Sequence, residues 1–269
     1  MNTKFSSRCF VAWYSADGVF QHVSMLPGAH NRGYLATING RLLLALNGLT
    51  ATIVGPDSTL TTSELGVALV EFDSSGNAVD SKMLLTYSGN VGLGGFSLSE
   101  AGIQITGGFT GDLTLGSGAN QLELLRGPAR MLVASYDPAG QLLWGKTTEQ
   151  ASGSALAADP ILPGGAIVIG RYSGPTVFGE GEEEETTITP VATSGMFVAR
   201  YKPSGDLDWV RSPSSEGLTN AFYELAVGEF GQIAVSGVYN TRATFGEGEA
   251  NQTRLTGRQG NGFTAVFAP

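Results

Sequence analysis

The sequence of 269 residues has little of what several protein classes require. Cys9 is its single cysteine, which excludes an intramolecular disulfide framework and a metal site built on cysteine ligands. Because Cys9 directly precedes the apolar run Phe10-Val11-Ala12, we interpret it as a small apolar strand residue. Charged residues make up only 14% of the chain, and long stretches rich in Ala, Glu, Lys, Arg and Leu are missing. This composition disfavours helical bundles and coiled coils.

Positive charge is also scarce. The formal net charge is −9, and lysine and arginine form no cluster along the chain. Nucleic-acid backbones and anionic lipid headgroups repel such a protein, so we expect neither as a partner. No apolar run approaches the roughly 20 residues of a membrane-spanning helix. Residues 1–14 lack the continuous apolar segment of a signal peptide, which predicts a cytoplasmic protein, with a mature exported fragment as the alternative.

Glycine, by contrast, is abundant at 39 residues, and it takes part in an internal repeat. Four segments align, and a fifth begins near the end of the chain: CFVAWYSADG (9–18), VALVEFDSSG (67–76), MLVASYDPAG (131–140), MFVARYKPSG (196–205) and GFTAVF (262–267). The aromatic residue that closes each apolar run recurs at intervals of 58, 64, 65 and 66 residues. In each full copy a glycine follows this aromatic residue by four positions, so the repeat is real.

Each copy is predicted to contain two hairpins. Asp137-Pro138-Ala139-Gly140 places proline where φ near −65° is needed and glycine where φ is positive, which is typical of a type I turn with a glycine bulge. A strand such as Leu142–Trp144 follows this turn. The second hairpin is apolar on both arms, which predicts strands buried on both faces. It covers residues 34–46, 96–107, 155–170 and 223–237, with Gly40, Gly102, Gly165 and Gly231 at the turns.

Four short antiparallel strands in each tandem copy predict an all-β fold, namely a β-propeller of four blades, with five blades as the alternative. The single domain would span residues 1–269, with repeats at about 9–66, 67–130, 131–195 and 196–261 and a partial repeat at 262–269. Both termini are expected to complete one blade and so close the ring. Phe10–Tyr14 and Phe263–Phe267 are equivalent, however, which leaves one surplus strand. An open β-solenoid or two stacked sandwiches remain alternatives.

The consensus (M/F)-(F/L)-V-A-x-Y-x-P-x-G-x-L-x-W, followed by an apolar hairpin and a G-x-Y-x-G-x-x-x-F-G segment, resembles the bacterial β-propeller repeat family. The resemblance spans nearly the whole chain. The residues that carry it are Met131–Trp144, Met196–Trp209, Gly170–Gly179 and Gly237–Gly246. His22 and Asp80 stand where these copies have Trp144 and Trp209. The resemblance implies a propeller scaffold and brings no catalytic residues with it.

Two features could be taken for binding sites. Residues 178–185 (FGEGEEEE) and their counterpart 245–249 (FGEGE) lack the ligand spacing of a calcium loop, so we expect a solvated, solubilising loop. Trp144 and Trp209 occupy the same position in successive copies. A sugar-binding platform is conceivable there, but we expect the two rings to wedge between blades.

Loops that join successive blades converge near the central channel of a propeller, where ligands bind. The candidate ligand- or partner-binding residues there are His30, Asn31, Arg32, Asn90 and Asn220. His22 and His30 are the only histidines, and no catalytic triad order, phosphate-binding loop or dinucleotide fingerprint occurs. We therefore predict a non-enzymatic module that binds a protein partner, without cofactor or metal. A carbohydrate-binding lectin is the alternative, and the surplus strand could mediate homo-oligomers.

Overall fold

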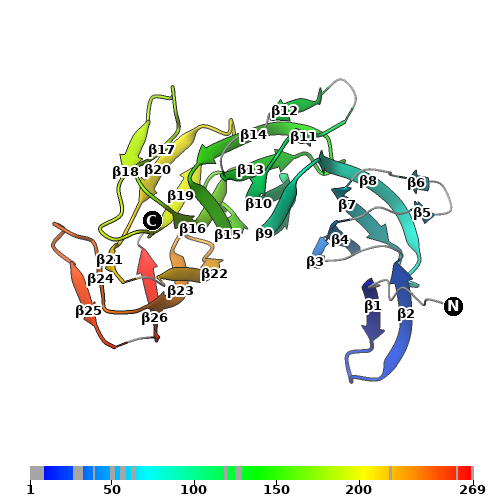
Figure 1. Ribbon diagram of the computed structural model, residues 1–269. Helices are drawn as coiled ribbons and strands as arrows, with labels where there is room; N and C mark the ends of the chain where they lie inside the picture. The colour runs from blue at the N-terminus through cyan, green and yellow to red at the C-terminus, as the bar shows by residue number, and fades with distance from the viewer. Residues whose placement is uncertain are drawn as a thin grey trace, which may run out of the picture. The chain divides into compact units, whose positions relative to one another are not determined.

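The computed structural model describes residues 9–26, 33–38, 40–48, 52–54, 59–61, 65–117, 120–124, 129–217, 220–258 and 260–267. These residues form strands joined by turns and contain no helix (Figure 1). None of the sheets that these residues form closes on itself. The prediction of an all-β fold is confirmed.

The long strands form antiparallel sheets in chain order, and from here on the copies are numbered by these sheets, so that the third copy covers residues 151–211 and is shifted along the chain from the sequence repeat 131–195. The first sheet contains β3 (Gly33–Ile38), β4 (Arg41–Asn47), β7 (Leu65–Phe72) and β8 (Ala78–Tyr87). The second contains β9 (Asn90–Ser99), β10 (Gly102–Thr110), β13 (Arg130–Tyr136) and β14 (Leu142–Glu149). The third contains β15 (Ala151–Ala158), β16 (Ala166–Tyr172), β19 (Gly195–Tyr201) and β20 (Leu207–Arg211). The fourth contains β22 (Ala221–Val227), β23 (Ile233–Tyr239) and β26 (Asn261–Phe267). A separate hairpin, β1 (Cys9–Tyr14) and β2 (Phe20–Leu26), precedes them.

The chain divides into two compact units. The first comprises Met1–Val91, Gly111–Arg126 and Asp137–Leu142, and the second comprises Gly92–Thr110, Gly127–Tyr136 and Leu143–Pro269. In the first unit the β1–β2 hairpin packs on β4 and β7 through Val11 and Leu26, with Cys9 and Trp13 at the border of this core. The apolar interpretation of Cys9 therefore agrees with its place in the fold, where burial raises the pKa of its thiol.

The repeated turns have the predicted geometry. Gly18, Gly76, Gly140 and Gly205 have φ of 84°, 82°, 78° and 90°, values that L-residues with side chains rarely adopt. In each turn the glycine N–H donates to the carbonyl three residues earlier at 2.9–3.0 Å. In the second hairpins Gly40, Gly102 and Gly231 also have positive φ, whereas in the third copy the positive φ belongs to Gly164 and not to Gly165.

Gly76, Gly140 and Gly205 also pack against the strand that ends the preceding copy, whereas no atom lies within 4 Å of a Cβ added at Gly18. A Cβ added at Gly76 would lie 2.5 Å from the His22 ring, and one at Gly140 would lie 2.5 Å from the Lys82 side chain. One added at Gly205 would lie 2.8 Å from the Trp144 ring. These three glycines are therefore required twice, once for φ and once for close packing.

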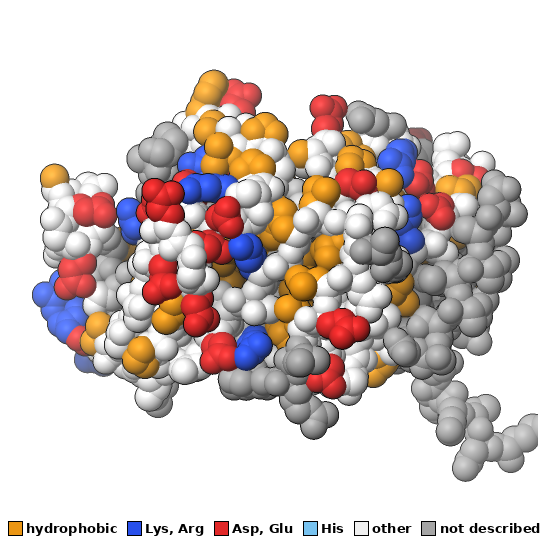
Figure 2. Space-filling model, turned by 90° about the horizontal axis from the view of Figure 1, so that it is seen from above, with side chains coloured by type: hydrophobic (Ala, Val, Ile, Leu, Met, Phe, Trp, Pro, Cys, Tyr) orange, Lys and Arg blue, Asp and Glu red, His pale blue; other side chains and the backbone are white. Residues whose placement is uncertain are grey.

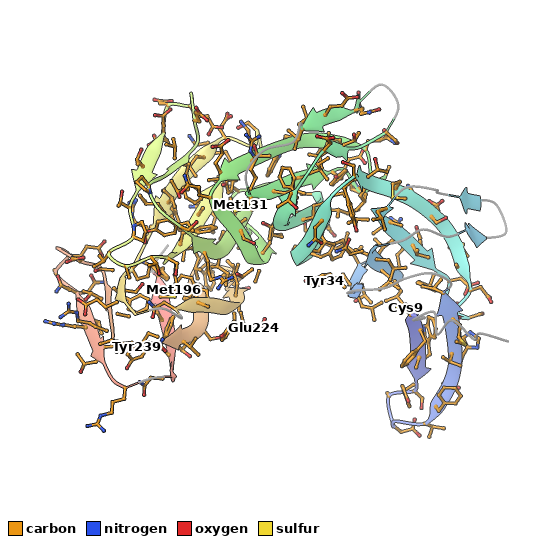
Figure 3. All side chains as sticks on the ribbon, in the orientation of Figure 1. Cys9, Tyr34, Met131, Met196, Glu224 and Tyr239 are labelled. Atoms are coloured by element: carbon orange, nitrogen blue, oxygen red, sulfur yellow. The ribbon has the colours of Figure 1, made fainter. Side chains whose placement is uncertain are left out.

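Burial differs between the arms of the second hairpins. The second strands β4, β10 and β16 are almost fully buried, as predicted. The first strands β9 and β15 instead mix buried with more exposed residues, and β3 has no buried residue, so the prediction of burial on both faces is wrong for all three. β23 alternates as well, because one face of the fourth sheet packs on the third sheet within the second unit. Met131 and Met196, both fully buried, lie in the cores between these sheets (Figure 3).

A small hairpin, which the sequence did not predict, separates the second and third strands of each sheet. These hairpins are β5 (Thr52–Val54) with β6 (Thr59–Thr61), β11 (Leu113–Leu115) with β12 (Leu122–Leu124), β17 (Thr176–Phe178) with β18 (Thr186–Ile188), and β24 (Arg242–Phe245) with β25 (Thr253–Thr256). β11 pairs with the end of β8, and β24 pairs with β21 (Ser214–Glu216). In both cases the small hairpin ties its own copy to the preceding one.

Candidate functional site

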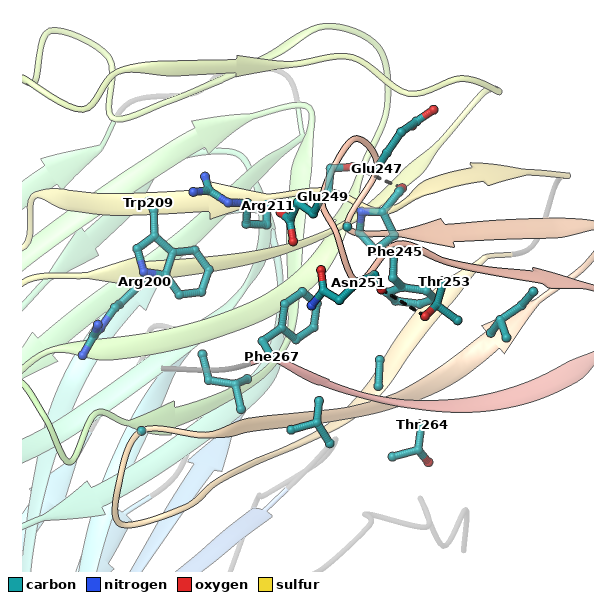
Figure 4. A pocket seen from close by; sticks show the side chains of 18 residues that line it. Arg200, Trp209, Arg211, Phe245, Glu247, Glu249, Asn251, Thr253, Thr264 and Phe267 are labelled. Atoms are coloured by element: carbon teal, nitrogen blue, oxygen red, sulfur yellow. Dashed lines mark hydrogen bonds between the residues drawn. The ribbon is translucent and has the colours of Figure 1, made fainter.

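A cavity of about 790 Å³ lies in the second unit, beside the outer edge of β26. One wall comes from β19 and β20, with Arg200, Trp209 and Arg211 (Figure 4). The opposite wall comes from the end of β24, with Phe245, and from the loop between β24 and β25, with Glu249. The remaining lining comes from β23, β25, neighbouring turns and β26 itself: Ser212, Pro213, Gly231, Ile233, Gly246, Glu247, Asn251, Thr253, Leu255, Thr264, Ala265, Val266 and Phe267.

The cavity occupies the place of a fourth strand. β19 pairs on one side with β16 and on the other with β20, where Tyr201 stands opposite Leu207 and Arg200 opposite Trp209. β26 is the counterpart of β19, and Phe267 takes the place of Tyr201. β26 pairs with β23, and among the described residues no strand pairs with its other edge. Its backbone hydrogen-bonding groups therefore face the cavity side of the sheet.

The acidic loop has the same backbone in the third and fourth copies. Gly179 and Gly246 have φ of 64° and 61°, and Gly181 and Gly248 have φ of 77° and 83°. In the third copy the N–H of Glu182 donates to the Gly179 carbonyl at 2.9 Å, and the N–H of Gly181 donates to the Glu185 carboxylate at 2.7 Å. The fourth copy repeats both bonds at 2.9 Å each, from Glu249 to Gly246 and from Gly248 to the amide oxygen of Gln252.

Glu182 is a structural link in the third copy. Its Oε1 lies 2.6 Å from Nζ of Lys146 on β14, and its Oε2 accepts the backbone N–H of Leu207 at 2.5 Å. Burial acts to lower the pKa of Lys146, but hydrogen bonds to Glu182 and Asp206 outweigh it, so the pKa of Lys146 is raised. The Glu182 side chain is only 14% exposed. The expectation of a purely solvated acidic loop is therefore wrong at this residue, because the glutamate joins two sheets.

The described residues of the fourth copy have the same arrangement without a counterpart of β20. Glu249 corresponds to Glu182, yet its carboxylate is exposed and has no partner among the residues that the structure describes. Arg211 corresponds to Lys146. Its guanidinium lies 5.9 Å from the centre of the Trp209 ring and donates to the Val210 carbonyl at 3.1 Å. A carboxylate and a guanidinium thus face the position that Asp206 and Leu207 occupy in the third copy.

The apolar residues that line the cavity are more exposed than their counterparts in the third copy. Phe178 is fully buried and Tyr201 is 2% exposed, whereas their counterparts Phe245 and Phe267 are only partly buried. A Cβ added at Gly179 would lie 2.9 Å from Cβ of Leu207, and no such leucine stands over Gly246.

Gly116 in the second copy shows the same leucine contact, to Leu142, again at 2.9 Å from an added Cβ. Two copies therefore seat a leucine on the glycine that follows the small hairpin's first strand. In the fourth copy the same glycine and phenylalanine line an open slot.

A buried ion pair fixes one wall of the cavity. The Arg200 guanidinium donates to both carboxylate oxygens of Asp159, at 2.5 and 3.2 Å, and the Asp159 side chain is fully buried. The hydrogen bond to Asp159 raises the pKa of Arg200. The same carboxylate accepts the backbone N–H groups of Ile161 and Leu162, so its charge is well satisfied.

The sequence-predicted site residues lie elsewhere. His30, Asn31 and Arg32 fall outside the described residues. Asn90 is the exposed first residue of β9 and belongs to the first unit. Asn220, in the second unit, is buried: its amide donates to the carbonyls of Glu216 and Gly217 and accepts the N–H of Asn240. Partner binding at these residues stays a prediction, and the contacts of Asn220 are those of a loop clamp.

The two tryptophans have different surroundings. Trp144 is 9% exposed and stacks on Tyr201 of the next sheet, with ring centroids 6.3 Å apart, so the prediction of a wedge between sheets is confirmed for it. Trp209 is partly exposed at the cavity. Sequence reasoning missed Phe245, Glu249 and Phe267, although the repeated FGEGE segment was the signal that could have found the first two.

Among the described residues no group of three His, Cys, Asp or Glu side chains is placed to hold a metal ion. No helix in this part of the chain is long and apolar enough to cross a membrane. On the face seen in Figure 2, acidic, basic and apolar side chains are interspersed.

No family model and no curated protein matches the chain. Two solved structures of AztD from Citrobacter koseri are similar to it, one of them of the apo protein. They share 13% and 14% identity with this chain over 91% and 94% of its length, with TM-scores of 0.38 and 0.36. The chain spans 66% of the length of each. TM-scores this low carry no argument about the fold or the function.

Proposed function

We propose that the four sheets are blades of a β-propeller, four in number, and that the protein is a non-enzymatic module that binds other proteins. Packing of the turn glycines Gly76, Gly140 and Gly205 on the preceding copy supports the propeller, because it repeats one contact along the chain. A fifth blade that includes the β1–β2 hairpin is the alternative. Self-association through a surplus strand also belongs to this proposal.

The observation that carries the binding function is the unpaired edge of β26 beside the cavity. An exposed sheet edge offers a row of backbone donors and acceptors, and peptides bind such edges as an added strand. Side-chain slots next to the edge supply specificity, and Phe245, Phe267, Arg211 and Glu249 provide slots of mixed chemistry here. The site therefore suits an extended polypeptide better than a compact small molecule.

Selection of phage-displayed random peptides against the purified chain tests this function. The matched variants are Arg211→Glu and Glu249→Lys at the cavity, and Arg171→Glu and Glu183→Lys at exposed positions outside its lining. We expect enriched peptides that lose at least tenfold in affinity with the cavity variants and keep their affinity with the other two. Enrichment that is equal for all four variants would refute binding at this edge.

A second candidate function rests on Trp209. Its partly exposed ring lines the same cavity as Glu247 and Asn251, and an aromatic face with polar groups in the same cavity is the kind of surface on which a pyranose stacks. A glycan array with the chain and its Trp209→Ala variant tests it. Glycans that bind the chain and not the variant would favour the lectin. Such a sugar site would not recur in every blade, because Trp144, the counterpart of Trp209, is buried under Tyr201 and offers no such surface.

A further inference from the structure

We propose that the groove along β26 takes, from a partner polypeptide, an antiparallel strand of the pattern glycine–acid–aliphatic–x–aromatic. This inference rests on the proposed binding function and specifies the chemistry of its ligand. It follows from the third copy, which holds such a strand in the same surroundings: Gly205-Asp206-Leu207-Asp208-Trp209.

The backbone register comes first. In the third sheet Leu207 stands opposite Tyr201 and Trp209 opposite Arg200. Transferred to β26, the aliphatic residue of the ligand stands opposite Phe267 and the aromatic residue opposite Val266. Val266 is 68% exposed, so an aromatic side chain beside it would cover apolar surface that the fourth sheet leaves open.

The aliphatic residue has a shaped slot. Leu207 sits over Gly179 and contributes to a core in which Phe178 is fully buried. Gly246 and Phe245 form the same floor in the fourth copy, where Phe245 is partly buried. A leucine-sized side chain restores the missing packing, whereas a charged one would be desolvated there without a partner.

Two charges hold the two residues that follow the glycine of the ligand. In the third copy Lys146 lies 3.1 Å from the Asp206 carboxylate, and Glu182 accepts the N–H of Leu207. Arg211 and Glu249 hold these positions in the fourth copy. The acid of the ligand therefore faces Arg211, and the N–H of its aliphatic residue donates to Glu249.

The same chemistry argues against the chain's own β2 as the ligand. When the turn glycines are aligned, β2 offers Val19 where Asp206 stands, Phe20 for Leu207 and His22 for Trp209. Val19 leaves Arg211 without a carboxylate, and Phe20 exceeds the slot that leucine fills in two copies. A strand from a partner, with an acid at this position, complements the groove better.

The test uses a fluorescein-labelled peptide with the sequence PSGDLDWVR, which is residues 203–211, and the full 269-residue chain, with anisotropy as the readout. We expect saturable binding that weakens at least tenfold with Arg211→Glu or Glu249→Lys and is unchanged with Arg171→Glu. A peptide with lysine at the position of Asp206 should bind the Arg211→Glu variant at least tenfold more tightly than the original peptide does. A peptide with aspartate in place of leucine should not bind the chain.

Failure of this peptide to exceed a scrambled control overturns the strand pattern. The binding function itself would survive if phage-selected peptides of another pattern still depended on Arg211. Binding that appears only with Phe20→Glu would show that β2 of the same chain fills the groove and would overturn the partner proposal. Dissociation of an oligomer by the peptide would show that a second molecule of this protein fills the groove, and this result would also overturn the partner proposal.

Discussion

Replacement of Gly205 by alanine tests the packing of turns on the preceding copy. Gly205 has φ of 90°, and a new Cβ would lie 2.8 Å from ring carbons of Trp144. Trp144 is 9% exposed and stacked on Tyr201, so the ring has little room to move away. We expect about 1–2 kcal/mol from the left-handed backbone and about 1–3 kcal/mol from overpacking.

Gly181 provides the matched control. It has φ of 77° in the same unit, but no atom lies within 4 Å of its added Cβ. Gly181→Ala should therefore lose only the backbone contribution, about 1–2 kcal/mol. The difference between the two variants isolates the contact with Trp144.

Guanidinium unfolding followed by circular dichroism measures both variants, alone and in a Trp144→Leu background. In that background the cost of Gly205→Ala should fall to that of Gly181→Ala, because the ring that the new methyl group meets is gone. If Gly205→Ala costs the same in both backgrounds, to within about 0.5 kcal/mol, the two residues are not coupled and the inter-sheet contact is refuted.

Three further predictions concern the links within the second unit and one residue outside it. Glu182→Ala should destabilise the protein by about 2 kcal/mol, because it removes a charge-assisted bond to a backbone N–H, whereas Glu249→Ala, at the equivalent but open position, should change stability by less than about 0.5 kcal/mol. Asn220→Ala should lower the free energy of unfolding by about 1–3 kcal/mol, because it leaves buried loop groups unpaired. Asn90→Ala, at an exposed position, should leave stability unchanged. Equal denaturant midpoints for the two variants would refute the role of Asn220 as a loop clamp. Asp159→Ala should cost about 3–5 kcal/mol by stranding a partly buried Arg200, and a thermal midpoint equal to that of the wild type would contradict this.

The strands and turns were predictable because each is specified locally. Gly140 and Gly205 take the backbone conformation that their turns demand, and apolar runs such as Met131–Tyr136 form the buried strands. Burial on both faces was correct for β10 and β16, which lie inside their sheets. The same prediction failed for the first strands, because they lie at sheet edges, where apolar composition does not tell which face is covered.

The small hairpins and the cavity were not predictable in the same way. β17 and β24 have only three and four residues, too few for a period-two pattern to stand out. The role of Glu182 depends on Lys146, 36 residues earlier, and on the N–H of Leu207, 25 residues later. Neither distance has a signature in the sequence, so a run of glutamates was interpreted by its composition alone.

The position that contacts the following turn recurs from copy to copy, although different residues occupy it. His22, Lys82 and Trp144 are three different residue types, yet each contacts the glycine of the following turn. Polar groups support the same place: the Ser24 hydroxyl donates to the Gly76 carbonyl, and Nζ of Lys82 donates to the Ala139 carbonyl at 2.5 Å.

Trp209 and Arg211 stand at the corresponding positions of β20, and they line the cavity instead of contacting a turn. Three occupied places thus define what the fourth accepts. The ligand must bring its own tight turn, because a residue other than glycine there would meet the Trp209 ring as alanine at position 205 would meet Trp144. Glycine is for this reason the first residue of the proposed pattern, and the peptide should lose affinity when that glycine alone is replaced by alanine.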